Sequence, residues 1–302
     1  MRNLTALLLA LALGLSALPA AASFENIAVS PRARAMGGGA VAVADDAYAP
    51  YFNPAGLAGL TAPQAAASYL RPFGVSFVDF VYVGGVWPLD GRYGTLGLGV
   101  RRLATEWQDV DLERETTLTL AHGLTLYQDM HSTMRLGLSA NVYNLKFGPT
   151  VGSDGEGTDG FDPGSDTVLG LDAGLLVTVR ERTRIGVLVH NVNNPQIGLD
   201  QEEIGQRVHG GVAYAAYEGV WTTFEFENAL GEDVAYHGGV EVALDYGLAL
   251  RLGVATNPEK VTAGFGYRWR GLAVDYGFSG GGGTLEGTHQ FGVGWAWGGE
   301  AR

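Results

Sequence analysis

The first residues of this chain with ligand-binding potential form a glycine-rich run. Gly37-Gly38-Gly39-Ala40-Val41-Ala42 fits the G-x-G-x-x-A pattern of dinucleotide-binding turns. That chemistry requires an apolar strand before the run and a helix after it, because the pyrophosphate binds at the helix N-terminus. No apolar strand precedes Gly37, and the chain that follows has the pattern of strands. The run therefore predicts no nucleotide site.

A second candidate is a set of carboxylates in and beside the segment 147–165. Such oxygens suit Ca²⁺, but an EF-hand loop needs glycine where this chain has Asp159. We expect a solvated acidic loop and no resident metal, with a weak cation site as the alternative. The residues are Asp154, Glu156, Asp159, Asp162 and Asp166.

Nucleophilic catalysis lacks its usual residues. The chain has no Cys, which excludes thiol chemistry, and it has no G-x-S-x-G motif. His131-Ser132 falls in a predicted turn, away from any lipid-facing site. We therefore predict that the protein is not an enzyme, with no catalytic residues and no cofactor.

The charged side chains instead follow an alternation. Between Gly264 and Arg270, aromatic residues at odd positions alternate with glycine and arginine at even positions. A period of two indicates strands, because successive side chains point to opposite faces. One face of such a strand is apolar and ends in aromatic residues, and the opposite face carries glycines and charges. This division favours a closed barrel in lipid over a soluble sandwich. The titratable residues on the inward, lumen-lining parity are Arg101, Arg135, Asp172, Arg184, His190, Glu225, Glu227, His237, Glu241, Arg251, Arg268 and Asp275.

Both signs of charge occur on this inward face, so that many side chains can pair across the lumen. Buried charges need partners, and we therefore interpret them as a salt-bridged filling, with a selectivity lining as the alternative.

The alternation recurs in about fourteen segments without a linker. The fold class is therefore all-β, a transmembrane antiparallel β-barrel of about fourteen strands. Most segments reach the ~9–11 residues that a tilted strand needs to cross the hydrocarbon layer. The predicted strands are 64–72, 76–88, 92–103, 114–125, 132–146, 166–179, 182–192, 206–217, 219–228, 233–244, 246–256, 259–269, 271–279 and 286–297.

The connections alternate in length, as expected of barrels with short periplasmic turns and longer external loops. Tight turns are predicted at 88–91, 180–182, 218–219, 244–246 and 270–271, and longer loops around 104–113, 147–165, 193–205 and 279–285. Tryptophans near strand ends predict a girdle at the membrane interface. They are Trp87, Trp107, Trp221, Trp269, Trp295 and Trp297.

Residues 1–22 are predicted to be an export signal. Arg2 gives a positive start, an apolar run covers 4–18, and Pro19-Ala20-Ala21-Ala22 ends it with small residues. A permanent anchor is the alternative, although the run is shorter than the ~20 residues of a membrane-spanning helix. The net charge of -13 argues against a nucleic-acid partner, which would need a basic patch.

Residues 30–60 differ from everything that follows. The glycine-rich run from Ser30 to Asp46 ends in a double Asp, and Asn53-Pro54-Ala55-Gly56-Leu57 follows an aromatic residue. This stretch resembles the N-terminal signature of the FadL-type outer-membrane transporter superfamily, in which a similar glycine-rich run precedes Asn-Pro-Ala-Gly-Leu. The chain length and Thr288-His289-Gln290-Phe291 look closest to the shorter branch, which includes the PorV and PorQ proteins of type IX secretion.

The resemblance implies a fourteen-stranded barrel whose N-terminal segment folds inward as a hatch and moves to let hydrophobic ligands leave. It divides the chain into a signal at 1–22, a hatch at 23–62 and an outer-membrane barrel at 63–302. Two departures are the shortness of the chain, which leaves out long ligand-capturing loops, and its continuation past Trp297. The hatch residues that it implies are Gly37, Gly38, Gly39, Asp45, Asp46, Asn53, Pro54 and Ala55.

The residues of this segment agree with an internal plug. Pro50 and Pro54 lack amide donors and the glycines permit unusual backbone angles, so the segment cannot be a regular barrel strand. Irregular backbone at membrane depth must be enclosed by protein or by a watery lumen. A periplasmic lid with no gating role is the alternative.

Three functions remain open. A structural barrel with no cargo is one of them, and the other two belong to different classes. One is passive transport of a hydrophobic or amphipathic small molecule across the outer membrane, gated by the hatch. The other is a PorV-like, non-conducting barrel that holds cargo for a protein secretion system. We also expect Leu250 to face lipid, Gly253→Ser on the lumen side to be mild, and deletion of 24–58 to leave a folded barrel.

Overall fold

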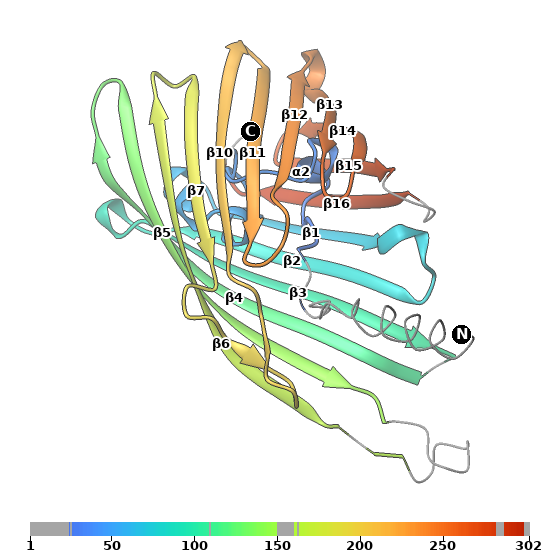
Figure 1. The fold of residues 1–302 in the computed structure, drawn as a ribbon. Coiled ribbons are helices and arrows are strands. Elements are labelled where there is room, and N and C mark those ends of the chain that lie inside the picture. Colours follow the sequence, from blue (N-terminus) through green and yellow to red (C-terminus); the bar gives the residue numbers. More distant parts are fainter. Residues whose placement is uncertain are drawn as a thin grey trace, which may run out of the picture.

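The computed structural model describes residue 24 and residues 26–108, 110–149, 160–161, 163–281 and 287–298. Within this part of the chain, fourteen antiparallel strands close into one barrel (Figure 1), as predicted. Neighbours in sequence are neighbours in the barrel, and β1 pairs with β16 to close it, from Gln64 opposite Ala296 to Arg71 opposite His289.

The elements follow the predicted strands closely. The barrel strands are β1 (Gln64–Arg71), β2 (Val78–Pro88), β3 (Thr95–Trp107), β4 (Val110–Gln128), β5 (Ser132–Phe147), β6 (Ser165–Val179), β7 (Thr183–His190), β10 (Arg207–Tyr217), β11 (Val220–Ala229), β12 (Ala235–Ala243), β13 (Leu248–Ala255), β14 (Lys260–Trp269), β15 (Leu272–Gly280) and β16 (Thr288–Ala296). Outside the barrel sheet, β8 (Gln196–Ile197) pairs with β9 (Glu202–Glu203). Single 3-10 turns are η2 (Pro72–Gly74), η3 (Gly91–Tyr93) and η4 (Asp245–Gly247).

The alternation places apolar side chains outward. On β13, Leu250 is 48% and Leu252 66% exposed, whereas Arg251 between them is 2% exposed. A charged side chain is thus enclosed by the barrel and leucines lie on its outer surface, where lipid supplies their apolar surroundings. The outward placement of Leu250 is as predicted.

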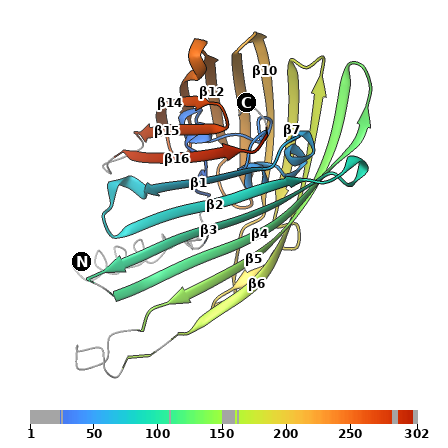
Figure 2. The ribbon, with the colours of Figure 1, turned by 180° about the vertical axis from the view of Figure 1, so that it is seen from behind.

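The loop predicted at 104–113 is wrong. β3 continues to Trp107 and β4 begins at Val110, with a register shift between Thr105 and Glu106. Charged residues occur in this stretch, but paired strands satisfy their backbone groups whether their side chains are polar or not. β3 to β6 are accordingly long and reach beyond the shorter strands on the other side (Figure 2).

The two ends of the barrel differ. We call one the turn end, formed by the tight connections 89–94, 129–131, 180–182, 218–219, 244–247 and 270–271. The opposite loop end includes the connections 72–77, 191–206, 230–234 and 256–259. β1 begins and β16 ends at the turn end, where Trp297 N donates to Pro63 O.

Ahead of β1, residues 26–63 form short helices and turns. They are α2 (Pro31–Ala35), α3 (Ala49–Phe52) and the 3-10 helix η1 (Pro54–Gly59). Each of the three carries a proline in its first turn, which fits the sequence-based expectation that this segment is not a regular strand. No helix in the described part of the chain is long and apolar enough to cross a bilayer.

One tryptophan is placed differently from the predicted girdle. Five of the six are outward and about half exposed, but Trp221 on β11 packs inside against Val41 and its neighbours. The Arg184 guanidinium carbon lies 4.4 Å from the Trp221 ring centroid. Trp221 shares the inward parity of Glu225, and strand parity rather than closeness to a strand end decides its direction.

Candidate functional site

The segment 26–63 crosses the inside of the barrel. α2 packs against β13 to β16, and η1 packs against β3 to β6 on the other side, as the blue segment in Figure 1 follows. Ser30 caps α2 by accepting from Ala33 N, and Pro31 occupies the first helical turn, where no amide donor is needed.

Asn53 fixes the turn between α3 and η1. Its Oδ1 accepts from Ala55 N at 3.1 Å, the local turn that the Asn-Pro sequence predicts. Its Nδ2 donates to Val41 O at 2.9 Å and to Leu175 O of β6 at 3.2 Å. A side chain with 0% exposure thus joins two parts of the segment to the barrel wall. Pro54 and Ala55 follow it into the wall of β4 and β5.

Glycines on the inner wall make room for the segment. At eleven inward positions of the described strands, an added Cβ would come under 3.0 Å from an atom of residues 31–58. We call these residues the glycine belt: Gly97, Gly123, Gly137, Gly174, Gly186, Gly211, Gly239, Gly253, Gly264, Gly277 and Gly292.

The belt brings backbone against backbone. Gly137 lies between Gly123 and Gly174 in the ladder, and a Cβ at Gly137 would collide with Pro54 and Ala55 N. Real Cβ atoms do not approach backbone this closely, so the segment fits only a wall without side chains there. The expectation that Gly253→Ser is mild is therefore wrong, because its Cβ would meet Gly37 N.

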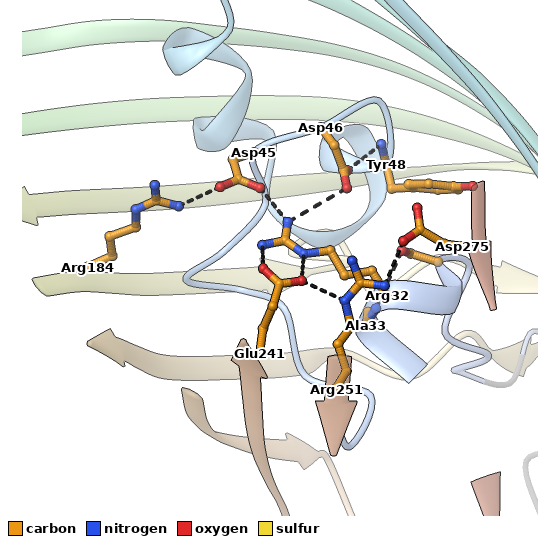
Figure 3. A network of polar contacts seen from close by, with 10 residues as sticks. Arg32, Ala33, Asp45, Asp46, Tyr48, Arg184, Glu241, Arg251 and Asp275 are labelled. Carbon is orange, nitrogen blue, oxygen red and sulfur yellow. Dashed lines mark hydrogen bonds and ion pairs between the residues drawn. The ribbon is translucent and has the colours of Figure 1, made fainter. Parts of the chain in front are cut away.

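A chain of alternating charges joins the segment to both sides of the lumen (Figure 3). On one side, Arg184 of β7 donates to Asp45 at 2.8 Å, and Arg32 of α2 donates to the same carboxylate at 2.6 Å. On the other side, Arg32 also binds Glu241 of β12. Arg251 of β13 continues the chain, at 2.6 Å from both Glu241 and Asp275.

The two adjacent aspartates have opposite electrostatics. Burial raises the pKa of Asp45, but ion pairs with Arg32 and Arg184 outweigh it and hold the pKa well below its usual range. Burial, together with the negative charge of the neighbouring Asp45, raises the pKa of Asp46 to about 6, although Arg32 at 3.9 Å acts in the opposite direction. Asp46 Oδ1 accepts from Tyr48 N at 2.9 Å. Asp45 is thus a fixed anion and Asp46 titrates near neutrality.

The glycine-rich run forms a turn held by polar groups of three strands, β11, β12 and β14. Gly37 and Gly38 have φ of +87° and +99°, which glycine alone adopts readily. Gly37 N donates to Thr262 of β14 at 3.0 Å, and Val41 N donates to Glu225 of β11 at 2.8 Å. Gly39 faces Glu225 closely as well.

The other lumen-lining candidates lie outside the charge chain. Asp172 of β6 accepts from Ser139 and Asn141 and lies 3.1 Å from His190. Arg101 stacks over Tyr51 with its guanidinium carbon 5.2 Å from the ring centroid. Glu227 lies beside His237, Arg135 faces Gly59 of η1, and Arg268 faces inward on β14.

Sequence reasoning missed several residues of the site. Arg32 and Arg34 were not singled out, because strand parity assigns no direction in an irregular segment. Arg34 donates to Gln290, Ser279 and Ala28 O, all neutral acceptors. The arginines of the family-like run were the available signal. His209, which lies 3.0 Å from Glu225, has inward parity on β10 and could have been found by it.

A cavity of about 580 Å³ lies between the segment and the loop end. The walls of β1 to β3 and of β10 to β12 face each other, since β2 and β11 are seven strands apart in either direction around the barrel. The first wall is apolar, with Leu70, Phe73, Val75, Val78 and Leu103, and the second is polar, with Arg207, His209, Glu225, Glu227 and His237. Its floor includes Ile27, Arg34, Gly37, Tyr51 and Phe52.

Of the predicted acidic loop, Asp154, Glu156, Asp159 and Asp162 lie outside the described residues, as does the export signal at 1–22. Asp166 accepts from Gly198 N at 2.8 Å, which ties the loop containing β8 to β6. In the part of the chain that is described, no three His, Asp or Glu side chains are arranged to hold a metal ion.

Solved structures with the same architecture were found by comparison of folds. The Ralstonia pickettii toluene transporter TbuX has a TM-score of 0.58 at 14% identity, over 88% of this chain and 97% of that one. The P. putida toluene transporter TodX has a TM-score of 0.59 at 13% identity, over 88% of this chain and 95% of that one. A Pseudomonas aeruginosa FadL homologue has a TM-score of 0.55 at 12% identity, over 88% of this chain and 98% of that one.

This chain has the FadL-type barrel fold. No family model matches the sequence. No curated protein matches it either. The fold predicted from the FadL-like signature is confirmed, and the PorV-like branch stays a prediction.

Proposed function

We propose that this protein is a passive outer-membrane transporter of small hydrophobic or amphipathic molecules, with residues 26–63 as its hatch. The fold supports this class, since the similar TbuX and TodX structures are described as toluene transporters. The loop end, with its longer connections, then faces the outside and the turn end faces the periplasm.

The observation that carries the proposal is the cavity above the segment. Its volume of about 580 Å³ suits a small ligand, and its apolar wall opposite a polar wall suits an amphipathic one. The segment spans the barrel from β13–β16 to β3–β6 beneath it. A molecule in this cavity therefore reaches the turn end only if part of the segment moves.

Deletion of residues 24–58 tests whether the segment closes the lumen. The barrel strands pair only with one another, and Arg251 keeps Glu241 and Asp275 as partners. We expect a folded barrel whose unboiled form migrates anomalously on gels and which leaks ions in liposomes, unlike the full chain. A folded, truncated barrel with the conductance of the full chain would refute the plug.

A reversible lock tests gating in the full-length protein. A Cβ on Gly211 would lie 2.7 Å from Val41 Cγ1, so Val41→Cys with Gly211→Cys brings two thiols into bonding range in a chain without Cys. We expect the oxidised pair to block solute uptake and reduction to restore it. Val41→Cys alone, which adds no atom to the glycine belt, is the control. Equal uptake in both redox states would show that this contact need not open.

One observation favours the non-conducting alternative. The glycine belt and the six-residue charge chain hold the segment as closely as a core element. A PorV-like barrel would keep the segment docked permanently and act through cargo or a secretion partner. Uptake that stays absent in the reduced lock variant and in the unmodified protein would favour this alternative.

A further inference from the structure

His237 of β12 stands between the hatch and the barrel wall. Its Nδ1 lies 2.7 Å from Gly37 O, in the left-handed turn of the glycine-rich run. Its Nε2 lies 3.3 Å from Glu227 Oε2 of β11. The ring also borders the cavity, as do Gly37 and Gly38.

Both nitrogens of this imidazole face acceptors. A carbonyl oxygen and a carboxylate each require a donor, and an imidazole donates from both nitrogens only when it is protonated. The neutral ring would turn a lone pair toward either Gly37 O or Glu227. The Nδ1 contact is a hydrogen bond, and the Nε2 contact at 3.3 Å is an ion-pair contact that is favourable only when the ring is an imidazolium.

The surroundings supply the counter-charge. On β11, Glu225 and Glu227 face the ring, and on β13 the ladder partner is Ala255. On β10, His209 is 3.0 Å from Glu225, and Arg207 is 4.0 Å from Glu227. From the segment, Asn26 donates to Glu227 at 2.7 Å, and Gly37 presents its carbonyl.

We propose that His237 is a proton-operated latch on the glycine-rich turn of the hatch. This inference rests on the proposed gating function and names its regulation. With the ring protonated, His237 ties Gly37 to Glu227 and the turn stays docked. When the proton leaves, one of the two contacts is lost and the hold on Gly37–Val41 weakens.

The sign of the pH effect follows from the contacts. The docked state is the one with the proton bound, so a rise in pH favours the undocked turn. Imidazole is the side chain that ordinarily titrates between about pH 5 and 8. Asp46 of the hatch, with a pKa of about 6, ionises in the lower part of this range and also weakens docking, so the part of the response that belongs to the ring is the part that a change at His237 removes.

Conductance of the full chain in planar bilayers, measured from about pH 5 to about pH 8.5, tests the latch. We expect open probability to rise about tenfold with pH, the effect of losing one buried ion-pair contact, that of His237 with Glu227. His237→Gln keeps a donor and cannot titrate, and should remove most of the pH response, leaving only the part that Asp46 contributes. His122→Gln, whose ring contacts Tyr93 O at the turn end, is the matched control and should respond like the unmodified chain.

Glu227→Gln tests the latch through the midpoint of the pH response, which would not shift if His237 had only a structural role. Removing the carboxylate takes away the partner of the imidazolium, so the midpoint of the pH response should shift to lower pH. A flat profile in the unmodified chain, or an unchanged profile in His237→Gln, would overturn the latch. If the 24–58 deletion conducts while the profile is flat, the latch fails and the gating proposal stands; a closed deletion barrel would refute both.

Discussion

Arg32 and Glu241, 209 residues apart in sequence, meet through two parallel hydrogen bonds. Arg32 Nε donates to Glu241 Oε2 at 2.9 Å, and Nη2 donates to Oε1 at 2.8 Å. Their side chains are 11% and 8% exposed. This two-pronged geometry suits guanidinium and carboxylate, and it fixes α2 against β12. It connects the hatch to the charges of the wall at one point.

Arg32→Ala should undock the hatch more than it harms the barrel. The change leaves Glu241 with Arg251 and Asp45 with Arg184, so the loss is partial. We expect the free energy of unfolding to fall by about 3 kcal/mol, which is the lower end of the range for breaking a buried ion pair. Thermal unfolding and bilayer conductance together measure it. Arg32→Lys keeps the positive charge but cannot form two parallel hydrogen bonds, so its stability and conductance should lie between those of Arg32→Ala and the unmodified chain. If Arg32→Ala has the stability and conductance of the unmodified chain, Arg32 does not hold the hatch.

Gly137→Ala should disturb the hatch because its methyl would collide with backbone at Pro54 and Ala55. Overpacking of this kind lowers the free energy of unfolding by about 1–3 kcal/mol. Gly294 on β16 is the control, since an added Cβ there meets its nearest atoms at 3.6 Å. Limited proteolysis of the segment and thermal unfolding provide the measurements. If Gly137→Ala and Gly294→Ala behave alike, the glycine belt does not hold the segment.

Leu250→Arg should destabilise the barrel in lipid by about 2–4 kcal/mol, the cost of a cation on the lipid face at mid-depth. Leu250 is outward and 48% exposed. Leu244→Arg, at the turn end after β12, should cost about 0–1 kcal/mol, because the penalty falls toward the interface. Refolding equilibria into lipid vesicles compare the two. Equal costs would place Leu250 outside the hydrocarbon layer.

Asp46→Asn should stabilise hatch docking at pH 8 and not at pH 4. The folded pKa of about 6 lies above the ordinary value of 3.8, so the carboxyl lowers stability as pH rises from about 4 to about 6. Asn removes the charge and can still accept from Tyr48 N. The side chain is 31% exposed, which reduces the expected gain to about 1 kcal/mol. Melting temperatures of both proteins at the two pH values measure it; a gain at pH 4 equal to that at pH 8 would refute this cause.

Period-two patterning predicted all fourteen strands, because each strand separates lipid from lumen and its sequence records that division locally. The same parity placed Glu241, Arg251 and Asp275 inside, where the ladder pairs Glu241 with Arg251. The prediction failed in two places: at the β3–β4 ladder, where charged residues pair in strands as far as Trp107 and Val110, and at Trp221, where closeness to a strand end was used instead of parity.

What the sequence determined by itself is the barrel and the existence of an irregular segment that prolines and glycines keep out of the ladder. Only the tertiary structure decided which wall residues meet that segment. Strand parity predicts whether a side chain points into or out of the barrel, but not which residue of the segment lies at the same level along the barrel axis. An irregular segment has no period from which the direction of its side chains could be derived. Arg32 could therefore be matched to Glu241, and Gly137 to Ala55, only once the barrel had closed around the chain, because both contacts join residues that no local repeat relates.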